Sequence, residues 1–194
     1  SKLQQRDFKT FVLLGDSELA EGSIYEALQL ASHYKLNNLV AFVDINRLGQ
    51  RGETMLGHNI KTYKKRFQSF GWNTIVIDGH NIKQILRALT KAKYSKTPTA
   101  VLAKTFKGKG VSFLENKEDW HGKPVPSNKL SLALEEIPNS EFPQININKP
   151  NKSNIKKIIK KKPKLNSYKI GDSVATRKAY GSALASLAIE NSDI

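Results

Sequence analysis

The chain has 194 residues, 39% of them hydrophobic, and its 32 Lys+Arg against 17 Asp+Glu give a formal net charge of +15 at pH 7. This length suits one domain, or one domain with part of a second, and the absence of cysteine excludes disulfides, thiolate metal sites and cysteine nucleophiles. No run of 18 apolar residues occurs and no charged-then-apolar leader follows Ser1, so we expect no membrane span, no secretion and a cytoplasmic location.

The first part of the chain predicts a β–α–β unit. Residues 11–14 are a short apolar run that ends at Gly15-Asp16, which is typical of a buried strand and its turn. Residues 23–34 are then expected to form a helix. Its apolar face is predicted at Ile24, Ala27, Leu28 and Ala31. Residues 39–45 are a nearly continuous apolar run, which indicates a strand covered on both faces.

The alternation continues and predicts an α/β fold with a doubly wound, mostly parallel sheet. We expect a helix over residues 63–70, a strand over 74–78 and a strand over 99–105. Between the last two strands, a helix is expected with an apolar face at Ile82, Ile85, Leu86 and Leu89.

The pattern loosens after the strand at 99–105. A stretch rich in glycine, proline and charge predicts a loop, followed by a short helix over residues 131–136. Residues 176–190 again have helical periodicity. Their apolar face is predicted at Ala179, Ala183, Leu184, Leu187 and Ala188.

The excess positive charge is concentrated in one segment. Eight lysines and no carboxylate lie between Lys149 and Lys164, among two prolines and two asparagines. This composition is typical of a solvated linker. A grip on nucleic acid or on anionic lipid is the alternative, but no aromatic side chain interleaves the lysines to stack on bases. We therefore expect neither nucleic acid nor a membrane as a partner.

Two strand ends carry polar side chains suited to a metal and a phosphate. Asp16 follows the first predicted strand, and Asn46 lies thirty positions later at the end of the next one. The carboxyl ends of neighbouring parallel strands meet at one edge of a sheet, where ligands bind. A carboxylate, an amide oxygen and a loop carbonyl suit Mg²⁺ or Ca²⁺, and a helix after Asp16 could aim its N–H groups at a diphosphate. Alternatively, Asp16 caps that helix and Asn46 makes a turn.

The residues around these strand ends resemble a known family. GDSELAEGSIYEAL, followed after 12 residues by AFVDINRLGQ, resembles the thiamine-diphosphate signature of transketolases, usually written GDG with an asparagine about thirty residues later. FGWNTIVIDGH, AKTFKGKGVSFLENKEDWHGKPVP and SYKIGDSVATRKAYGSALASL resemble animal transketolases still more closely. The resemblance runs from about Phe11 to the end and is weakest in the lysine-rich segment.

This resemblance implies a thiamine-diphosphate-binding fold that is incomplete at both ends. Residues 1–136 would be the later part of the diphosphate-binding domain, and residues 137–172 a lysine-rich linker. Residues 173–194 would be the first helix of a truncated pyrimidine-binding domain. On this reading the 194-residue chain alone is expected to be inactive.

The resemblance also implies ligands for the cofactor and its metal. Asp16 and Asn46 would bind Mg²⁺ or Ca²⁺ through their side chains, and Leu48 would bind it through its backbone carbonyl. Position 17 would donate its N–H to the diphosphate of thiamine diphosphate. Ser17 stands where the family has glycine; we expect it to be tolerated with a negative φ, its hydroxyl capping a free N–H or adding a phosphate donor.

Three further residues receive roles from the resemblance. Lys107 would approach the cofactor, and His121 would contact both the cofactor and the sugar substrate as a catalytic residue. Glu21 would lie at the subunit interface and link the two active sites of a homodimer. Without the resemblance, Lys107 and His121 would be ordinary surface residues. Glu21 would then be a helix-start glutamate favoured by the helix dipole.

The function that the resemblance implies is transketolase chemistry. The protein would transfer a two-carbon ketol unit from a ketose phosphate to an aldose phosphate through thiamine diphosphate, as part of the pentose phosphate pathway. The alternative is a truncated or non-catalytic transketolase-like protein that keeps the fold without activity. Ser17 is the departure inside the motif that keeps this alternative open.

Overall fold

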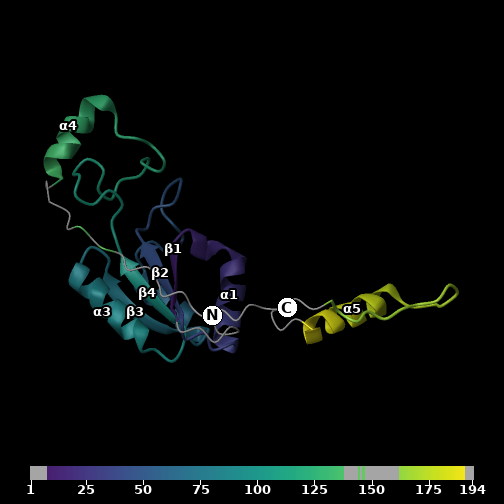
Figure 1. Ribbon diagram of the computed structural model, residues 1–194. Coiled ribbons are helices and arrows are strands. Elements are labelled where there is room, and N and C mark those ends of the chain that lie inside the picture. Colours follow the sequence, from purple (N-terminus) through teal and green to yellow (C-terminus); the bar gives the residue numbers. More distant parts are fainter. Residues whose placement is uncertain (1–7, 138–143, 145, 147–161, 191–194) are drawn as a thin grey trace. The chain divides into compact units, whose positions relative to one another are not determined.

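A computed structural model of the chain describes residues 8–137, 144, 146 and 162–190. Contacts divide the chain into two units, residues 1–141 and residues 142–194. The first unit contains a four-stranded sheet whose strands are all parallel (Figure 1). Their order across the sheet is β1 (Thr10–Gly15), β2 (Leu39–Ile45), β4 (Thr99–Lys104) and β3 (Asn73–Asp78). The predicted α/β class and parallel sheet are confirmed.

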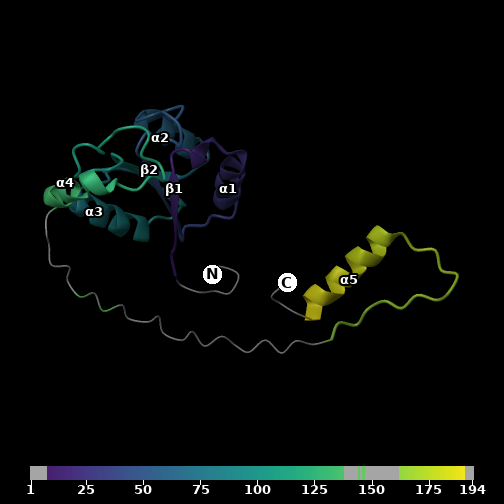
Figure 2. The ribbon, with the colours of Figure 1, turned by 90° about the horizontal axis from the view of Figure 1, so that it is seen from above.

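Helices cover both faces of this sheet. Helices α1 (Gly22–His33) and α2 (Ile60–Ser69) pack on one face, and α3 (Ile82–Lys93) packs on the other. Figures 1 and 2 show α1 and α3 on opposite sides of the strands. The chain runs from β1 to β2 and then past β4 to β3 before it turns back. Since parallel crossovers are right-handed, this reversal explains why α3 lies on the opposite face.

The two central strands, β2 and β4, are buried on both sides, as the apolar run of residues 39–45 predicted for β2. Along β4, Ala100 and Leu102 face the core under α1 and α2, whereas Val101 and Ala103 face the core under α3. This alternation follows from the two-residue period of a strand. The indole of Trp72 is buried in the larger core, where its Nε1–H donates to the carbonyl of Leu28 at 3.0 Å. The sheet is therefore fixed between two packed layers.

Two details of the predicted core are wrong. Strand β1 forms at the expected place, but it is the edge of the sheet, and Phe11 and Leu13 are 55% and 76% exposed. An apolar run specifies a strand without specifying what covers it. In α3, the large side chains of Ile82 and Leu86 are exposed, while Ala88 and Ala92 are buried on the sheet. Small side chains let α3 approach the sheet closely. A prediction based on large apolar residues therefore misses the helix face that carries these alanines.

The segment after β4 has no helix or strand until α4 (Ser127–Glu136), which begins four residues before the predicted helix. The Glu136 carboxylate accepts hydrogen bonds from the N–H and the hydroxyl of Ser112, at 2.5 and 2.7 Å, and so joins α4 to the preceding loop. The loop folds tightly at Gly108, where φ is +72° and an added Cβ would lie 2.8 Å from Leu114.

The second unit contains α5 (Thr176–Glu190), which buries none of its residues. The predicted lysine-rich linker falls largely outside the described residues, which resume at residue 162. Among the described helices, none is long and apolar enough to cross a membrane.

Candidate functional site

The two strand ends that carry Asp16 and Asn46 lie side by side. Strands β1 and β2 pair in parallel with Gly15 opposite Asp44, and the Asp16 N–H donates to the Asp44 carbonyl at 3.1 Å. Asp16 and Asn46 therefore leave the sheet at the same edge. Asp16 does not cap a helix, because a short 3-10 turn (Glu18–Ala20) follows and α1 begins only at Gly22. The predicted helix is confirmed, because α1 begins within one residue of its expected start at residue 23, and the orientation of its N–H groups toward a diphosphate stays a prediction.

Asp16 is a buried carboxylate, with 4% of its surface exposed. Its Oδ2 accepts hydrogen bonds from the Arg47 N–H at 2.7 Å and from the Thr54 hydroxyl at 3.5 Å. Burial raises the pKa of Asp16 above its ordinary value, and the nearby Asp44 raises it further, whereas the N–H groups of Arg47 and Ser17 lower this pKa. In the described part of the chain, no ion pair involves Asp16. A carboxylate held in this way fits a bound cation that supplies the missing positive charge.

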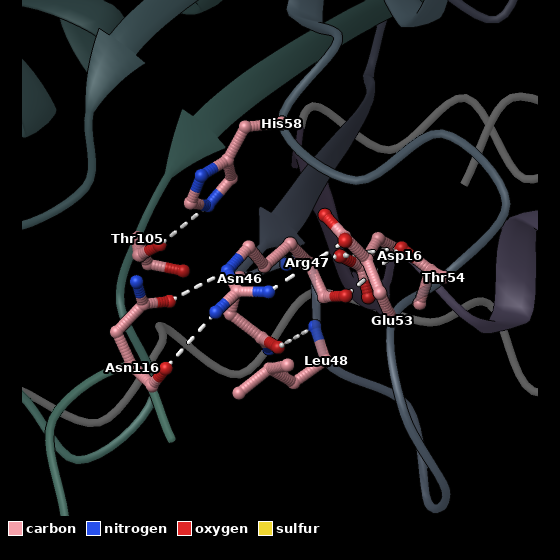
Figure 3. A network of polar contacts seen from close by, with 9 residues as sticks. All are labelled: Asp16, Asn46, Arg47, Leu48, Glu53, Thr54, His58, Thr105 and Asn116. Atoms are coloured by element: carbon pink, nitrogen blue, oxygen red, sulfur yellow. Dashed lines mark hydrogen bonds and ion pairs between the residues drawn. The ribbon is translucent and has the colours of Figure 1, made fainter. Parts of the chain in front are cut away.

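Asn46 is oriented by its neighbours. Its amide NH₂ donates to Asp44 Oδ2 at 3.0 Å, and the other oxygen of Asp44 accepts from the Thr105 hydroxyl. The Asn46 Oδ1 accepts from the Leu48 N–H at 2.9 Å (Figure 3). Because the NH₂ group is hydrogen-bonded to Asp44, the amide oxygen of Asn46 faces the loop that follows β2.

The donor set agrees with a hard divalent cation. Asp16, Asn46 and the Leu48 carbonyl offer carboxylate, amide and carbonyl oxygens, which Mg²⁺ and Ca²⁺ prefer. The Leu48 side chain is buried, which anchors its backbone. Within the residues that the structure describes, no cluster of three His, Asp or Glu offers another metal site. The residues present therefore fit the metal that the sequence predicted.

Lys107 and His121 lie at the same loop. The Lys107 Nζ donates to the Leu48 carbonyl at 3.4 Å and lies 3.3 Å from His121 Nδ1. Because an ammonium group only donates, His121 Nδ1 is the acceptor, and in the neutral ring the proton is on Nε2. His121 is exposed, so this Nε2–H can meet a ligand from solvent. The structure thus brings Lys107 and His121 to the predicted metal loop.

Ser17 and Glu21 follow Asp16 along the chain. Ser17 has a φ of −65°, so the expected negative φ is confirmed, but its hydroxyl makes no capping hydrogen bond and that expectation is wrong. Glu21 is exposed at the start of α1, and its side chain does not cap the helix. Among the described hydrogen bonds, none joins Glu21 to the metal loop.

A cleft of about 300 Å³ opens beside Asp16 and Ser17. Its other walls are formed by the loop after β2, the 3-10 turn and α2, with Gly49, Thr54, Met55 and Tyr63 among the lining residues. Burial raises the pKa of the Tyr63 phenol, which stays neutral at physiological pH. The cleft gives the buried carboxylate access to a ligand.

Sequence reasoning missed the residues that hold the site together. Arg47 contacts Asp16, Glu53 and Asn116, and its place between Asn46 and Leu48 was the only signal that could have found it. Asp44 orients Asn46 as described above. Side-chain contacts also anchor the start of the loop after β4: His58 Nε2–H donates to the Thr105 carbonyl at 2.9 Å, and His80 Nε2 accepts from the Phe106 N–H at 2.8 Å.

Comparison with known proteins agrees with this site. A family model described as "Transketolase, thiamine diphosphate binding domain" matches residues 2–170. Human transketolase is 45% identical over 194 residues, which cover 93% of this chain and 29% of that protein. The mouse protein named transketolase-like protein 2 is 46% identical over 189 residues, which cover 95% of this chain and 30% of that protein. The chain therefore spans less than a third of the length of these curated relatives.

Solved structures give the same result. A transketolase from Campylobacter jejuni is similar with a TM-score of 0.54 and 38% identity, over 57% of this chain and 17% of that one. A transketolase mutant from Pichia stipitis, described as a complex with fructose-6-phosphate, has a TM-score of 0.58 and 31% identity. That match covers 66% of this chain and 19% of the other.

Proposed function

Because the chain belongs to the transketolase family, within its thiamine-diphosphate-binding domain, we propose that it forms part of a transketolase. That enzyme transfers a two-carbon ketol unit from a ketose phosphate to an aldose phosphate. The observation that carries the proposal is the buried carboxylate of Asp16, which has no cationic partner among the described residues and lies beside the Asn46–Leu48 loop.

We propose that Asp16, Asn46 and the Leu48 carbonyl hold Mg²⁺, or Ca²⁺ in its place, and that this ion holds the diphosphate of thiamine diphosphate. The Ser17 N–H would donate to the same diphosphate. When bound, the cofactor supplies the nucleophilic carbon and the electron sink that ketol transfer requires. The contribution of this chain is to neutralise the diphosphate and to fix its position.

Lys107 and His121 are proposed to act on the cofactor and the sugar. The Lys107 ammonium brings positive charge to the phosphate side of the site. The Nε2–H of His121 is free to donate to a sugar oxygen, because Nδ1 is held by Lys107. A histidine titrates near neutral pH and suits proton exchange with substrate hydroxyl groups. His121 is therefore the residue proposed to contact both cofactor and substrate.

The remaining assignments concern the whole protein. We propose a cytoplasmic homodimer in the pentose phosphate pathway, with Glu21 at the interface between subunits. The exposure of Glu21 at the start of α1 supports a contact there. Residues 1–136 would then act as the diphosphate-binding part, joined through residues 137–172 to the pyrimidine-binding part that begins at residue 173.

Cofactor titration of the complete protein encoded by the gene tests this function. We expect thiamine diphosphate to bind with Mg²⁺ present and to be lost in EDTA, and ketol transfer between a ketose and an aldose phosphate to follow the same dependence. The alternative is a non-catalytic relative, to which Ser17 in place of glycine points. Cofactor binding without ketol transfer would favour that alternative, and no cofactor binding under either condition would reject the proposed site.

A further inference from the structure

Arg47 lies between two of the proposed metal ligands and has an unusual backbone. Its φ is 65°, in the left-handed region that residues other than glycine rarely adopt. In this conformation its N–H donates to Asp16 Oδ2 at 2.7 Å, and its carbonyl accepts from the Thr54 N–H at 2.8 Å. Such a conformation persists only where surrounding contacts hold it.

The side chain of Arg47 supplies such contacts. Its Nε donates to Asn116 Oδ1 at 2.8 Å, and its Nη2 donates to the Asn116 carbonyl at 3.0 Å (Figure 3). Its Nη1 lies 3.7 Å from a Glu53 oxygen. The planar guanidinium thus grips one residue with two parallel hydrogen bonds, a geometry that lysine cannot reproduce.

Asn116 passes this contact on to Lys107. Asn116 also has a left-handed φ, of 56°, and its N–H donates to the Lys107 carbonyl at 2.8 Å. Lys107 in turn contacts the Leu48 carbonyl and His121. These contacts form a closed ring from the metal loop through Arg47 and Asn116 to Lys107 and back to Leu48.

We propose that Arg47 is a positioning residue that couples the metal loop to the loop carrying Lys107 and His121. Its backbone fixes the carboxylate of Asp16, and its side chain fixes the loop of residues 106–121. One residue therefore sets the distance between the groups that hold the diphosphate and the group that meets the sugar. The consequence for the sugar rests on the proposed function, whereas the order of the loop does not.

Amide hydrogen exchange of the complete protein, without ligands, tests the coupling directly. Arg47→Gly removes the guanidinium but keeps the N–H and the accessible φ. We expect exchange over residues 106–121 to become about tenfold faster in this variant, because two charge-assisted hydrogen bonds are lost, while β2 and β4 stay unchanged. Asn116→Gly can keep the positive φ but loses the side-chain acceptor, so hydrogen exchange of the same amides should become faster. Asn116→Asp should restore slow exchange, and Arg51→Ala is the matched control for charge.

Ligand measurements separate positioning from a general loss of structure. In Arg47→Gly, the KM for the ketose phosphate should rise about tenfold, whereas the Kd of thiamine diphosphate with Mg²⁺ should rise much less than in Asp16→Ala, because glycine keeps the N–H that binds Asp16 while Lys107 and His121 become less ordered. Unchanged exchange in both glycine variants would overturn the coupling. Faster exchange with an unchanged KM would overturn its role in sugar binding. Failure of the unaltered protein to transfer a ketol unit would reject the proposed function, and hydrogen exchange would still decide the coupling.

Discussion

The two loops that form the site are held in different ways. The loop of residues 46–54 is closed by its own backbone, through Gly49 N–H to Gly52 carbonyl at 2.9 Å and Thr54 N–H to Arg47 carbonyl at 2.8 Å. The loop of residues 105–121 also has backbone hydrogen bonds of its own, such as Asn116 N–H to Lys107 carbonyl at 2.8 Å, but it is anchored in addition by a side chain from elsewhere, because the bonds from Arg47 to Asn116 span 69 positions. Two of the proposed metal ligands, Asn46 and Leu48, thus sit on the loop that closes on itself, with Asp16 beside it after β1. The groups assigned to the cofactor and sugar sit on the loop that also needs a distant anchor.

This difference indicates which substitutions should act locally. A change at the metal site should remove metal and cofactor affinity while the fold persists, since the loop that carries Asn46 and Leu48 is closed by its own backbone. A change at a distant anchor should alter the second loop first. Substitutions in the complete protein encoded by the gene can test that division.

The largest effect is expected from Asp16→Ala. The substitution removes the only carboxylate of the proposed metal site, so thiamine diphosphate should lose its link to the protein. We expect affinity to fall more than about 100-fold, because removal of an outer partner alone costs 10–100-fold. Calorimetric titration with Mg²⁺ present measures this. An unchanged affinity in Asp16→Ala would show that the metal is held elsewhere.

A smaller effect is expected from Asp44→Ala. Asp44 does not belong to the proposed ligand set, but it holds the NH₂ group of Asn46 and the hydroxyl of Thr105. Its loss frees the amide to rotate, so Mg²⁺ affinity should fall about 10- to 100-fold. Asp44→Asn is the matched control, because its amide can accept from Asn46 and donate to Thr105. If Asp44→Ala and Asp44→Asn bound Mg²⁺ equally well, orientation of Asn46 would not matter.

Sequence reasoning succeeded where structure is local. The strand–helix alternation predicted every strand and helix of the sheet domain except the 3-10 turn, and the thirty-residue spacing of Asp16 and Asn46 predicted their meeting at one edge. Both depend on periodicity and topology, which short windows contain. The exposure of Phe11 was not predictable in this way, because a strand at the edge and a strand in the centre share the same apolar pattern.

The second loop shows why the rest could not be predicted. Lys107 and His121 entered through resemblance alone, since a lysine and a histidine in a glycine-rich segment are ordinary surface residues. The hydrogen bond that fixes the Asn116 side chain comes from the guanidinium of Arg47, which lies 69 positions earlier in the chain. Pairing of that kind follows from the fold and leaves no periodic trace in the sequence.

The pH dependence of stability provides a third test of the metal site. Burial raises the folded-state pKa of Asp16 above its ordinary value of 3.8. At pH values between this ordinary value and the raised pKa, the folded protein therefore binds more protons than the unfolded chain. Without metal, stability from this group therefore falls as pH rises from about that value through the raised pKa. In EDTA, Asp16→Asn should have a higher Tm than the unaltered protein at pH 7.

The difference in Tm isolates this group, because other titrations are common to both proteins. It should shrink as pH is lowered toward the raised pKa, where the unaltered carboxyl becomes neutral. Saturating Mg²⁺ and thiamine diphosphate should reverse the order at pH 7, since the ion compensates the buried charge. A Tm difference that is independent of pH would mean that Asp16 is ionised without cost.

The smallest effect is expected from Ser17→Gly. Glycine at this position in the family would be required only if the turn needed a positive φ or if a side chain blocked the phosphate. The φ of Ser17 is −65°, which any residue adopts, so the first requirement does not hold. The serine hydroxyl makes no capping hydrogen bond and lies on the side of Gly49, where it is 3.5 Å from the position of an added Cβ.

The remaining question for Ser17 is whether its hydroxyl meets the diphosphate. At most one hydrogen bond is at stake, which is about 1 kcal/mol or about fivefold in affinity. Titration of thiamine diphosphate with Mg²⁺ present, on the unaltered protein and on Ser17→Gly, measures this difference. A loss of up to fivefold in Ser17→Gly would show that the hydroxyl donates to the phosphate. A gain of several hundred-fold would show instead that serine blocks the diphosphate, and a site blocked in this way would belong to a non-catalytic relative.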